Sequence, residues 1–344
     1  MATAYDYIES NKRKSLIWAA LFPVSLMAFA FFTIWLMYFL WGVCSYFHPT
    51  NIFSWQSIWH NIWQGSLQTS LWALPLCGGL ALFWSLQALQ QGDQIVLEAI
   101  PSVRMVDKWD AYDACTLLEN LCLTTGDYLP KLYVLEDDSM NAFSVGMTPM
   151  HSAIVVSSGL LKHLDRVELE AVLAHELAHI RHYDTRLMVV LTVCVAFFTF
   201  CGEWLYYGEE KDNWIGGHSG RGLVTRRRFP LFVYLGAMLM GYGYIIAPFL
   251  RFAWSKQRDF LADAQAALTT RHPRALIKAL WHINRDSRIE VLEGQPMIGA
   301  MCIARPDFAS TIFTRLSGLE QAHPPLEERV LALNDMDGLF LEQQ

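Results

Sequence analysis

The most obvious lack in this 344-residue sequence is charge. Only 17% of the residues are Asp, Glu, Lys or Arg, against roughly 25% in average soluble domains, while 53% are hydrophobic. The shortage is concentrated, because no charged residue occurs between Lys14 and Asp93. Inside this gap, the apolar runs 15–43 and 66–89 each exceed the roughly 20 residues that a membrane helix needs. The sequence therefore predicts an integral membrane protein with an N-terminal transmembrane hairpin at residues 15–90.

Other absences exclude further classes of protein. The seven cysteines form no CxxC pair, and several lie in apolar runs, which indicates buried thiols in a reducing compartment. The formal net charge of −7 gives no basis for nucleic-acid binding. The first apolar run is too long for a signal peptide, whose core has about 7–15 residues, and no convincing cleavage site follows. We therefore expect the first run to be a retained helix.

Two further apolar runs predict a second hydrophobic hairpin at residues 187–250. These runs are 187–207 and 229–250. Lys and Arg residues flank the spans on one side, so the positive-inside rule puts residues 1–14, 91–186 and 251–344 in the cytoplasm. The last two segments are expected to be two halves of one peptidase domain. Basic residues in the loop between the later runs oppose this rule, so a hairpin packed inside the protein remains an alternative.

The motif HELAH, at residues 175–179, lies in a run with helical periodicity that Asp165 is suited to cap. Because positions four apart share one face of a helix, His175 and His179 can bind one metal ion together. Glu176 lies about 100° around the helix, where it can act as general base on a metal-activated water. A surface helix is the alternative, but this helix is too apolar, and burying two unpaired imidazoles is costly.

A catalytic zinc ion usually has a third protein ligand, and the nearest candidate, His182, is unsuitable. It lies seven residues beyond His175, which is about 10 Å along a helix axis. The metzincin pattern HExxHxxGxxH is also absent, because His182 and Thr185 stand where its glycine and last histidine belong. The third ligand must therefore come from another part of the chain.

The better candidates lie in a helical stripe within residues 255–268. Asp259 and Asp263 are one turn apart and are separated by small alanines, as on a helix that packs closely against another helix. One carboxylate could bind zinc, and the other could orient a ligand imidazole. The alternative is a pair of solvated acids that form ion pairs with Arg258 or Lys256.

Five ordered motifs resemble those of the HtpX-type membrane zinc endopeptidases, which are related to the type I CAAX prenyl proteases. The motifs are NAFSVG at 141–146, SAIVVSSGLL at 152–161, LEAVLAHELAHIRHYD at 169–184, SKQRDFLADA at 255–264 and HPPLEERVLAL at 323–333. The resemblance covers most of the chain from Leu132 onward. It implies an α+β, mainly α zincin of the gluzincin-like type, with the second hydrophobic hairpin inserted after the HExxH helix. It also implies a bacterial inner membrane and a catalytic domain that faces the cytoplasm.

The resemblance assigns roles residue by residue. His175, His179 and Asp259 match ligands of one zinc ion per chain, Glu176 matches the base, and Asp263 matches an acid that supports a ligand. The family usually has glutamate at the position of Asp259. Aspartate can bind zinc but is one methylene shorter, so either the helices approach more closely, or binding is weaker, or another group completes the site.

Two other motifs suggest contacts with a substrate. In the expected strand, Asn141, Ala142 and Phe143 would hold an extended polypeptide by backbone hydrogen bonds, although an ordinary core strand fits the same residues. His323 and Arg329 match positions near the zinc ion of related proteases, where either could stabilise the oxyanion. Alternatively, the sequence HPP only joins two helices, and Arg329 is ion-paired.

These observations predict a zinc endopeptidase in contact with the lipid bilayer. Its substrates would be membrane or misfolded proteins, a class that the resemblance implies. A CAAX-type prenyl protease is one alternative, although that class has more membrane spans than the four visible here. A zinc-free, non-catalytic scaffold is another, and it is suggested by the aspartate at position 259. Nothing indicates a nucleic-acid partner or specifies an oligomeric state.

Overall fold

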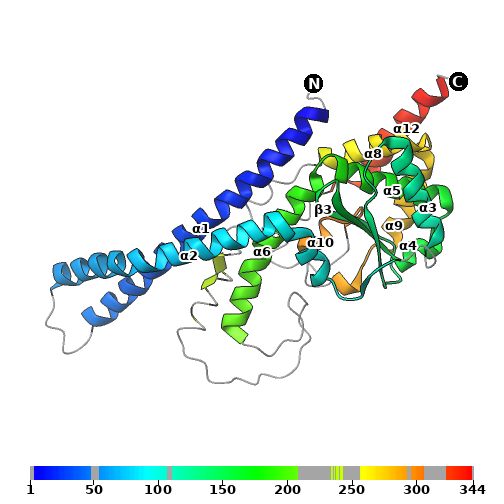
Figure 1. Cartoon of the computed structure of the whole chain (residues 1–344). Coiled ribbons are helices and arrows are strands. Elements are labelled where there is room, and N and C mark those ends of the chain that lie inside the picture. The colour runs from blue at the N-terminus through cyan, green and yellow to red at the C-terminus, as the bar shows by residue number, and fades with distance from the viewer. Residues whose placement is uncertain are drawn as a thin grey trace.

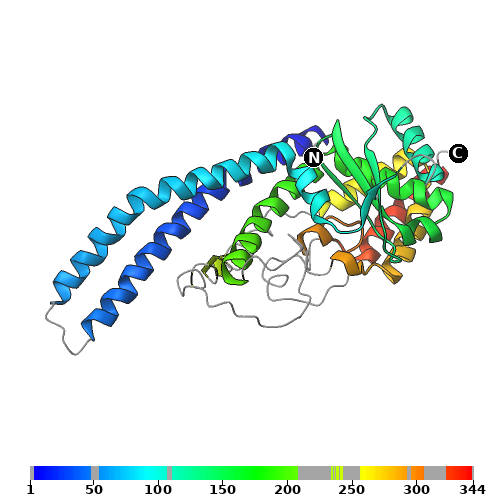
Figure 2. The same cartoon turned by 60° about the horizontal axis from the view of Figure 1, so that its bottom comes forward.

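The structure is a computed structural model that describes six stretches of the chain and a few single residues. These are residues 4–47, 54–106, 111–207, 256–292, 296–305 and 323–342, with 234, 236, 238, 239, 241 and 242. The described part is mainly helical and contains one small sheet, as the predicted α+β, mainly α class requires. A long helical hairpin projects from a compact region that contains the sheet (Figures 1 and 2).

The projecting hairpin consists of α1 (Ala4–Tyr46) and α2 (Trp55–Ala99). Both helices are long and apolar enough to cross a membrane. Many of their large side chains face outward; Leu71 and Trp72 are 73% and 82% exposed. An apolar surface of this extent is characteristic of contact with lipid or with another protein. Helical dihedral angles are interrupted at Gln91, beside the predicted end of the hairpin at residue 90.

The sheet has four strands in the order β1-β2-β4-β3. The strands are β1 (Val103–Met105), β2 (Lys131–Leu135), β3 (Ala142–Thr148) and β4 (His151–Ser157). Strands β2 and β4 are parallel, and the other two pairs are antiparallel. Strand β3, which contains most of the NAFSVG motif, therefore lies at the edge of the sheet.

Alternate side chains of the sheet enter two different hydrophobic cores, as the two-residue period of a strand requires. Phe143 and Val145 pack in a core with residues of α1, α2 and the start of α6 (Asp184–Tyr207). Ala142 packs on the opposite face with residues of α3 (Tyr112–Thr125) and α5 (Arg166–Arg181). The sheet thus has membrane-hairpin residues on one side and the HELAH helix on the other.

Helix α5 begins where the sequence predicts. The Asp165 carboxylate accepts hydrogen bonds from the backbone N–H groups of Val167 and Glu168, and the Glu168 carboxylate accepts one from the Asp165 N–H. This capping box satisfies amides that the helix itself cannot pair. From Leu169 onward, all but one of the next twelve residues are buried, which positions HELAH deep in the protein.

The described part of the chain has five further α-helices and one short 3₁₀ helix. They are α4 (Ser158–His163), α8 (Gln257–Thr270), α9 (Pro273–Arg285), the short 3₁₀ helix η1 (Glu290–Leu292), α10 (Pro296–Gly299) and α12 (Leu326–Glu342). Helix α8 packs directly against α5. The predicted stripe on α8 is confirmed, because Asp259, Ala262, Asp263 and Ala266 are all buried.

The third apolar run forms α6, and its first part is packed inside the protein. Leu187–Val195 contribute buried side chains to the core beside α1, α2 and β3. Most of the fourth run, residues 229–250, lies outside the described residues. The inserted hairpin at residues 187–250 therefore stays a prediction.

Candidate metal centre and active site

The two histidines of HELAH face each other in a buried position. His175 and His179 are 1% and 8% exposed, and their Nε2 atoms are 3.1 Å apart. Two nitrogens that each bind a tetrahedral zinc ion at about 2.0–2.1 Å are roughly 3.3 Å apart. The spacing of the two imidazoles is therefore that of a metal-binding pair, as the positions four apart on α5 predict.

A carboxylate and a guanidinium support His175 from behind. Its Nδ1 atom lies 2.9 Å from Asp263 Oδ1. Arg329 donates from Nε and Nη2 to the two oxygens of Asp263, both at 2.7 Å. Burial raises the pKa of Asp263, but Arg329 outweighs burial and lowers that pKa below its usual value. An ionised Asp263 keeps the proton of His175 on Nδ1 and leaves the Nε2 lone pair for a metal ion.

A second carboxylate supports His179 in the same way. His179 Nδ1 lies 2.9 Å from Asp184 Oδ2, and Asp184 is the first residue of α6. Burial lowers the pKa of His179, but Asp184, together with Glu176 and Asp259, outweighs burial and raises it. Sequence reasoning missed Asp184, although it is the last residue of the motif at 169–184. Because α5 ends at Arg181, helical spacing alone could not show that Asp184 turns back toward His179.

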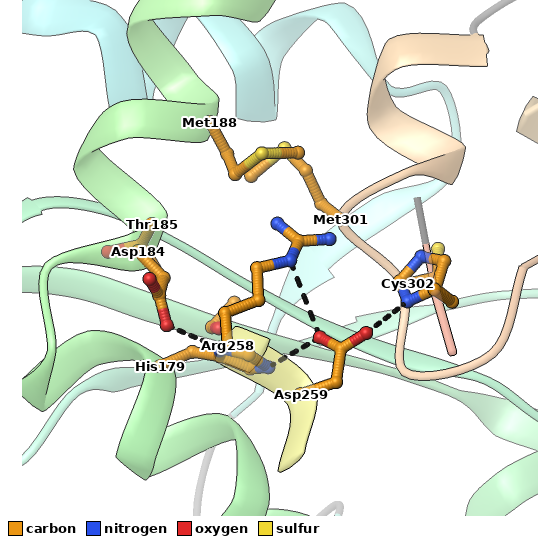
Figure 3. Close-up of a pocket in the computed structure, with 10 residues that line it drawn as sticks. His179, Asp184, Thr185, Met188, Arg258, Asp259, Met301 and Cys302 are labelled. Carbon is orange, nitrogen blue, oxygen red and sulfur yellow. Dashed lines mark hydrogen bonds and ion pairs between the residues drawn. The ribbon is translucent and has the colours of Figure 1, made fainter. Parts of the chain in front are cut away.

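Asp259 lies on the open side of the imidazole pair. One of its oxygens, Oδ1, is 3.7 Å from His179 Nε2 and 3.4 Å from Arg258 Nε, while Oδ2 is 2.9 Å from His323 Nδ1 (Figure 3). Burial raises the pKa of Asp259, but His323 and Arg258 outweigh burial and hold that pKa far below its usual range. The alternative of solvated acids on α8 is wrong, because Asp259 and Asp263 are each only 2% exposed.

The fit of a zinc ion to these residues can be judged from the donor set. Within the described ranges, no three His, Cys, Asp or Glu side chains already converge on one point. The distance of 3.7 Å between Asp259 and His179 is nevertheless only a few tenths of an ångström longer than the roughly 3.3 Å between neighbouring zinc ligands. Two neutral imidazoles and an ionised carboxylate are also the donor types that zinc prefers. The residues therefore fit the ion.

Two buried polar groups support the same interpretation. Both oxygens of Glu176 are buried, and neither they nor Nε2 of His323 has a hydrogen-bond partner among the described residues. Leaving such groups unpaired is costly, so they mark a place where a metal ion, a water molecule or a substrate belongs. His323 and Asp259 line one pocket with His179 and Cys302 (Figure 3).

The side chain of Asn141, predicted to contact substrate, forms hydrogen bonds with backbone groups of the protein itself. Its side-chain amide donates to the carbonyl groups of Ser287 and Ala304, at 3.1 and 2.8 Å. The Ala142 carbonyl accepts from the Ile303 N–H at 2.8 Å. The segment Ala300–Ala304 thus covers the beginning of the β3 edge, where substrate pairing is predicted.

The core-strand interpretation of this motif also holds. Phe143 is 1% exposed and Val145 is fully buried. Phe143 also forms an isolated antiparallel bridge with Cys302. Core packing and an edge position are thus combined in the same strand.

Arg329 is ion-paired, which is the second of the two alternatives that the sequence allows for it. Besides its two bonds to Asp263, it donates from Nη1 to the Ile303 carbonyl at 2.8 Å. Its donors are therefore committed to Asp263 and to the segment Ala300–Ala304. His323 differs, since its Nδ1 faces Asp259 and its Nε2 has no partner in the described part of the chain. Of the two candidates for oxyanion stabilisation, His323 has the more suitable geometry.

The chain is similar to known membrane proteases. The model of peptidase family M48 matches residues 120–337. The chain is 32% identical to a protease HtpX homolog of Dictyoglomus turgidum over 342 residues, covering 97% of this chain and 95% of that protein. It is also 32% identical to a protease HtpX homolog of Bacteroides fragilis over 263 residues, covering 76% and 79%. The crystal structure of S. mikatae Ste24p is 18% identical and covers 77% of this chain and 58% of that one, with a TM-score of 0.41.

Proposed function

This chain belongs to peptidase family M48 and is a membrane metalloendopeptidase, and from that premise we propose that His175, His179 and Asp259 hold its metal ion, which is zinc. One observation carries the assignment. The two Nε2 atoms lie 3.1 Å apart while each Nδ1 atom lies 2.9 Å from a carboxylate oxygen, so the two Nε2 atoms can bind one ion together. Zinc, when bound, polarises the peptide carbonyl and lowers the pKa of water.

Glu176 is the proposed general base. Its carboxylate is buried beside the two imidazoles and has no other partner among the described residues, so it can accept a hydrogen bond from a water molecule. It would take a proton from the attacking water and then deliver it to the nitrogen of the leaving amine. A base positioned in this way contributes about 10²- to 10⁴-fold to the rate.

His323 is the proposed donor to the oxyanion. Its Nδ1 contacts Asp259 at 2.9 Å, which fixes the ring and leaves Nε2 without a partner among the described residues. Burial lowers the pKa of His323, so the ring would donate from Nε2–H only after it takes up a proton; it could then stabilise the oxygen that becomes negative in the transition state. Arg329 supports the site through Asp263.

The proposed substrate-binding element is the edge of β3. An extended polypeptide would pair with the backbone of Ala142 and Phe143, where Cys302 and Ile303 pair in the substrate-free protein. Because one set of backbone hydrogen bonds replaces another, the exchange changes the number of hydrogen bonds little. Asn141 would then hold the displaced segment or the substrate backbone. Pairing of this kind tolerates many sequences, as a broad endopeptidase requires.

The proposed setting is a bacterial inner membrane, with the site on the cytoplasmic side and with membrane or misfolded proteins as substrates. The exposed apolar surface of α1 and α2 supports a site that is tethered close to the bilayer. The flanking Lys and Arg residues support the orientation.

The test compares purified wild type with Glu176→Gln on casein, on a membrane-protein substrate and on a prenylated peptide. The variant should bind zinc as the wild type does but lose cleavage by about 10²-fold or more. Equal cleavage by the two proteins would exclude Glu176 as the base. Cleavage of the prenylated peptide alone would instead favour a CAAX-type protease, and no zinc and no cleavage in the wild type would favour a scaffold.

A further inference from the structure

A side chain of the first membrane helix contacts the carboxylate that supports a proposed zinc ligand. Asn11 lies near the start of α1 and is only 2% exposed. Its Nδ2 donates to Asp184 Oδ1 at 2.7 Å and to the His182 carbonyl at 3.1 Å. We propose that Asn11 is a positioning residue for His179, acting through Asp184, so that α1 is a working part of the active centre. This inference rests on the proposed zinc site.

The hydrogen-bond geometry explains how a neutral amide can position a metal ligand. Asp184 is 4% exposed and uses one oxygen, Oδ2, to hold His179 Nδ1. Without Asn11, its other oxygen would lose its 2.7 Å donor. The two amide hydrogens of Asn11 join Asp184 to a carbonyl in the preceding turn. This pair of bonds restricts rotation of the carboxylate and therefore of the imidazole that it supports.

The turn itself depends on α1. Tyr183 lies between the two acceptors of Asn11 and has a left-handed backbone with φ of 58°. Such a conformation is unfavourable for a residue with a side chain, so surrounding contacts must hold it. The Lys12 ammonium lies 4.0 Å from the centre of the Tyr183 ring and adds a cation–π contact from the same helix. Two neighbouring residues of α1 thus hold the turn that follows HELAH.

The decisive readout is metal affinity, because a merely structural role would lower stability without a specific effect on the ligand. Zinc affinity of the full-length protein in detergent can be measured by competition with a chromophoric chelator. The absorption spectrum of the cobalt-substituted protein reports ligand geometry independently of cleavage. Asn11→Ala should weaken zinc binding by about tenfold, the lower end of the range for groups behind a ligand, and should alter the cobalt spectrum.

Two comparisons make this test specific. Ser45→Ala is the matched control on α1, because the Ser45 hydroxyl donates to the Trp41 carbonyl of its own helix. The zinc affinity of this variant should equal that of the wild type. In an Asp184→Asn background, Asn11→Ala should have little further effect, since both residues act through one contact. Additive effects would overturn the proposal.

The outcomes remain distinguishable if a variant folds poorly or the site assignment is wrong. Should Asn11→Ala not fold, Asn11→Gln retains the amide but moves it by one methylene, and its zinc affinity should still fall. Wild-type zinc affinity in a folded Asn11 variant would overturn the inference. If the wild type binds no zinc, the proposed function fails and the inference fails with it.

Discussion

The two histidines proposed as metal ligands each contact a carboxylate, but the groups behind the two carboxylates differ. His175 and His179 each contact a carboxylate oxygen through Nδ1 at 2.9 Å. Behind His175, Asp263 forms a bidentate ion pair with Arg329 of α12. Behind His179, Asp184 accepts from the neutral amide of Asn11, 173 residues away in sequence on α1.

The position of each carboxylate in its helix explains this difference. Asp263 lies in the interior of α8, where the helix offers no free N–H groups, so a buried negative charge needs a cation. Asp184 is the first residue of α6, where unpaired N–H groups and the helix dipole already favour a negative charge. A neutral amide is therefore sufficient behind Asp184. Asp263 is thus stabilised by an ion pair within the peptidase region. Asp184 is instead held in place by a neutral hydrogen-bond donor of the membrane hairpin.

The largest expected effect follows from breaking the charged support. Arg329→Met leaves Asp263 buried without its cation, which should reduce the free energy of unfolding by about 3–5 kcal/mol. Denaturant unfolding in detergent measures this change. Arg274→Met is the matched control, because the Arg274–Asp337 pair also joins α12 but the Arg274 side chain is 69% exposed. The control should lose about 1 kcal/mol or less, and equal losses would contradict the comparison.

The same ion pair predicts the sign of a pH effect. Arg329 holds the pKa of Asp263 below its usual value in the folded protein. The stabilisation is therefore present above the unfolded pKa of about 3.9 and is lost as the pH falls through the lower folded value. The difference in unfolding free energy between wild type and Arg329→Met should shrink below about pH 4. A difference that grows on acidification would refute this explanation.

A smaller effect distinguishes the two carboxylates by zinc affinity. Asp263→Asn and Asp184→Asn should each weaken zinc binding within the range of about 10- to 100-fold known for such groups. Asp263→Asn should lie near the upper end, because the amide also leaves Arg329 without its anion. Chelator competition measures both variants, and a larger loss for Asp184→Asn would reverse the proposed ranking.

The smallest expected effect concerns the cation–π contact beside Asn11. Lys12→Met removes an interaction worth about 0.5–1 kcal/mol at a partly exposed site, without touching Asp184. Unfolding should change by no more than that amount, and zinc affinity should stay within about twofold of the wild type. A tenfold loss of zinc affinity would mean that the turn as a whole, and not the Asn11 amide, positions His179.

The parts of the fold and site that local patterns could predict share a simple physical basis. The start of α5 at Asp165 depends on residues three apart, and the stripe of Asp259 and Asp263 depends on residues four apart. Both patterns are visible in sequence because they repeat within a turn of helix. The apolar length of α1 and α2 is equally visible.

The parts that sequence reasoning missed are contacts between distant segments. Asn11 is one polar residue near the basic end of an apolar helix, and no local period connects it to Asp184. The pairing of Cys302 with Phe143 at the edge of β3 has no signal in the NAFSVG motif either. Such contacts arise from tertiary packing, which propensity and periodicity do not encode.

The central claim is that HELAH and an aspartate of α8 form one zinc site. The most direct measurement is the zinc content of purified wild type, Asp259→Ala and Asp259→Glu after dialysis against a weak chelator. We expect about one zinc ion per chain in the wild type and in Asp259→Glu, and a loss of zinc in Asp259→Ala, because removing one of three protein ligands weakens binding most. Full zinc content in Asp259→Ala would contradict the account, as would a wild type that holds none.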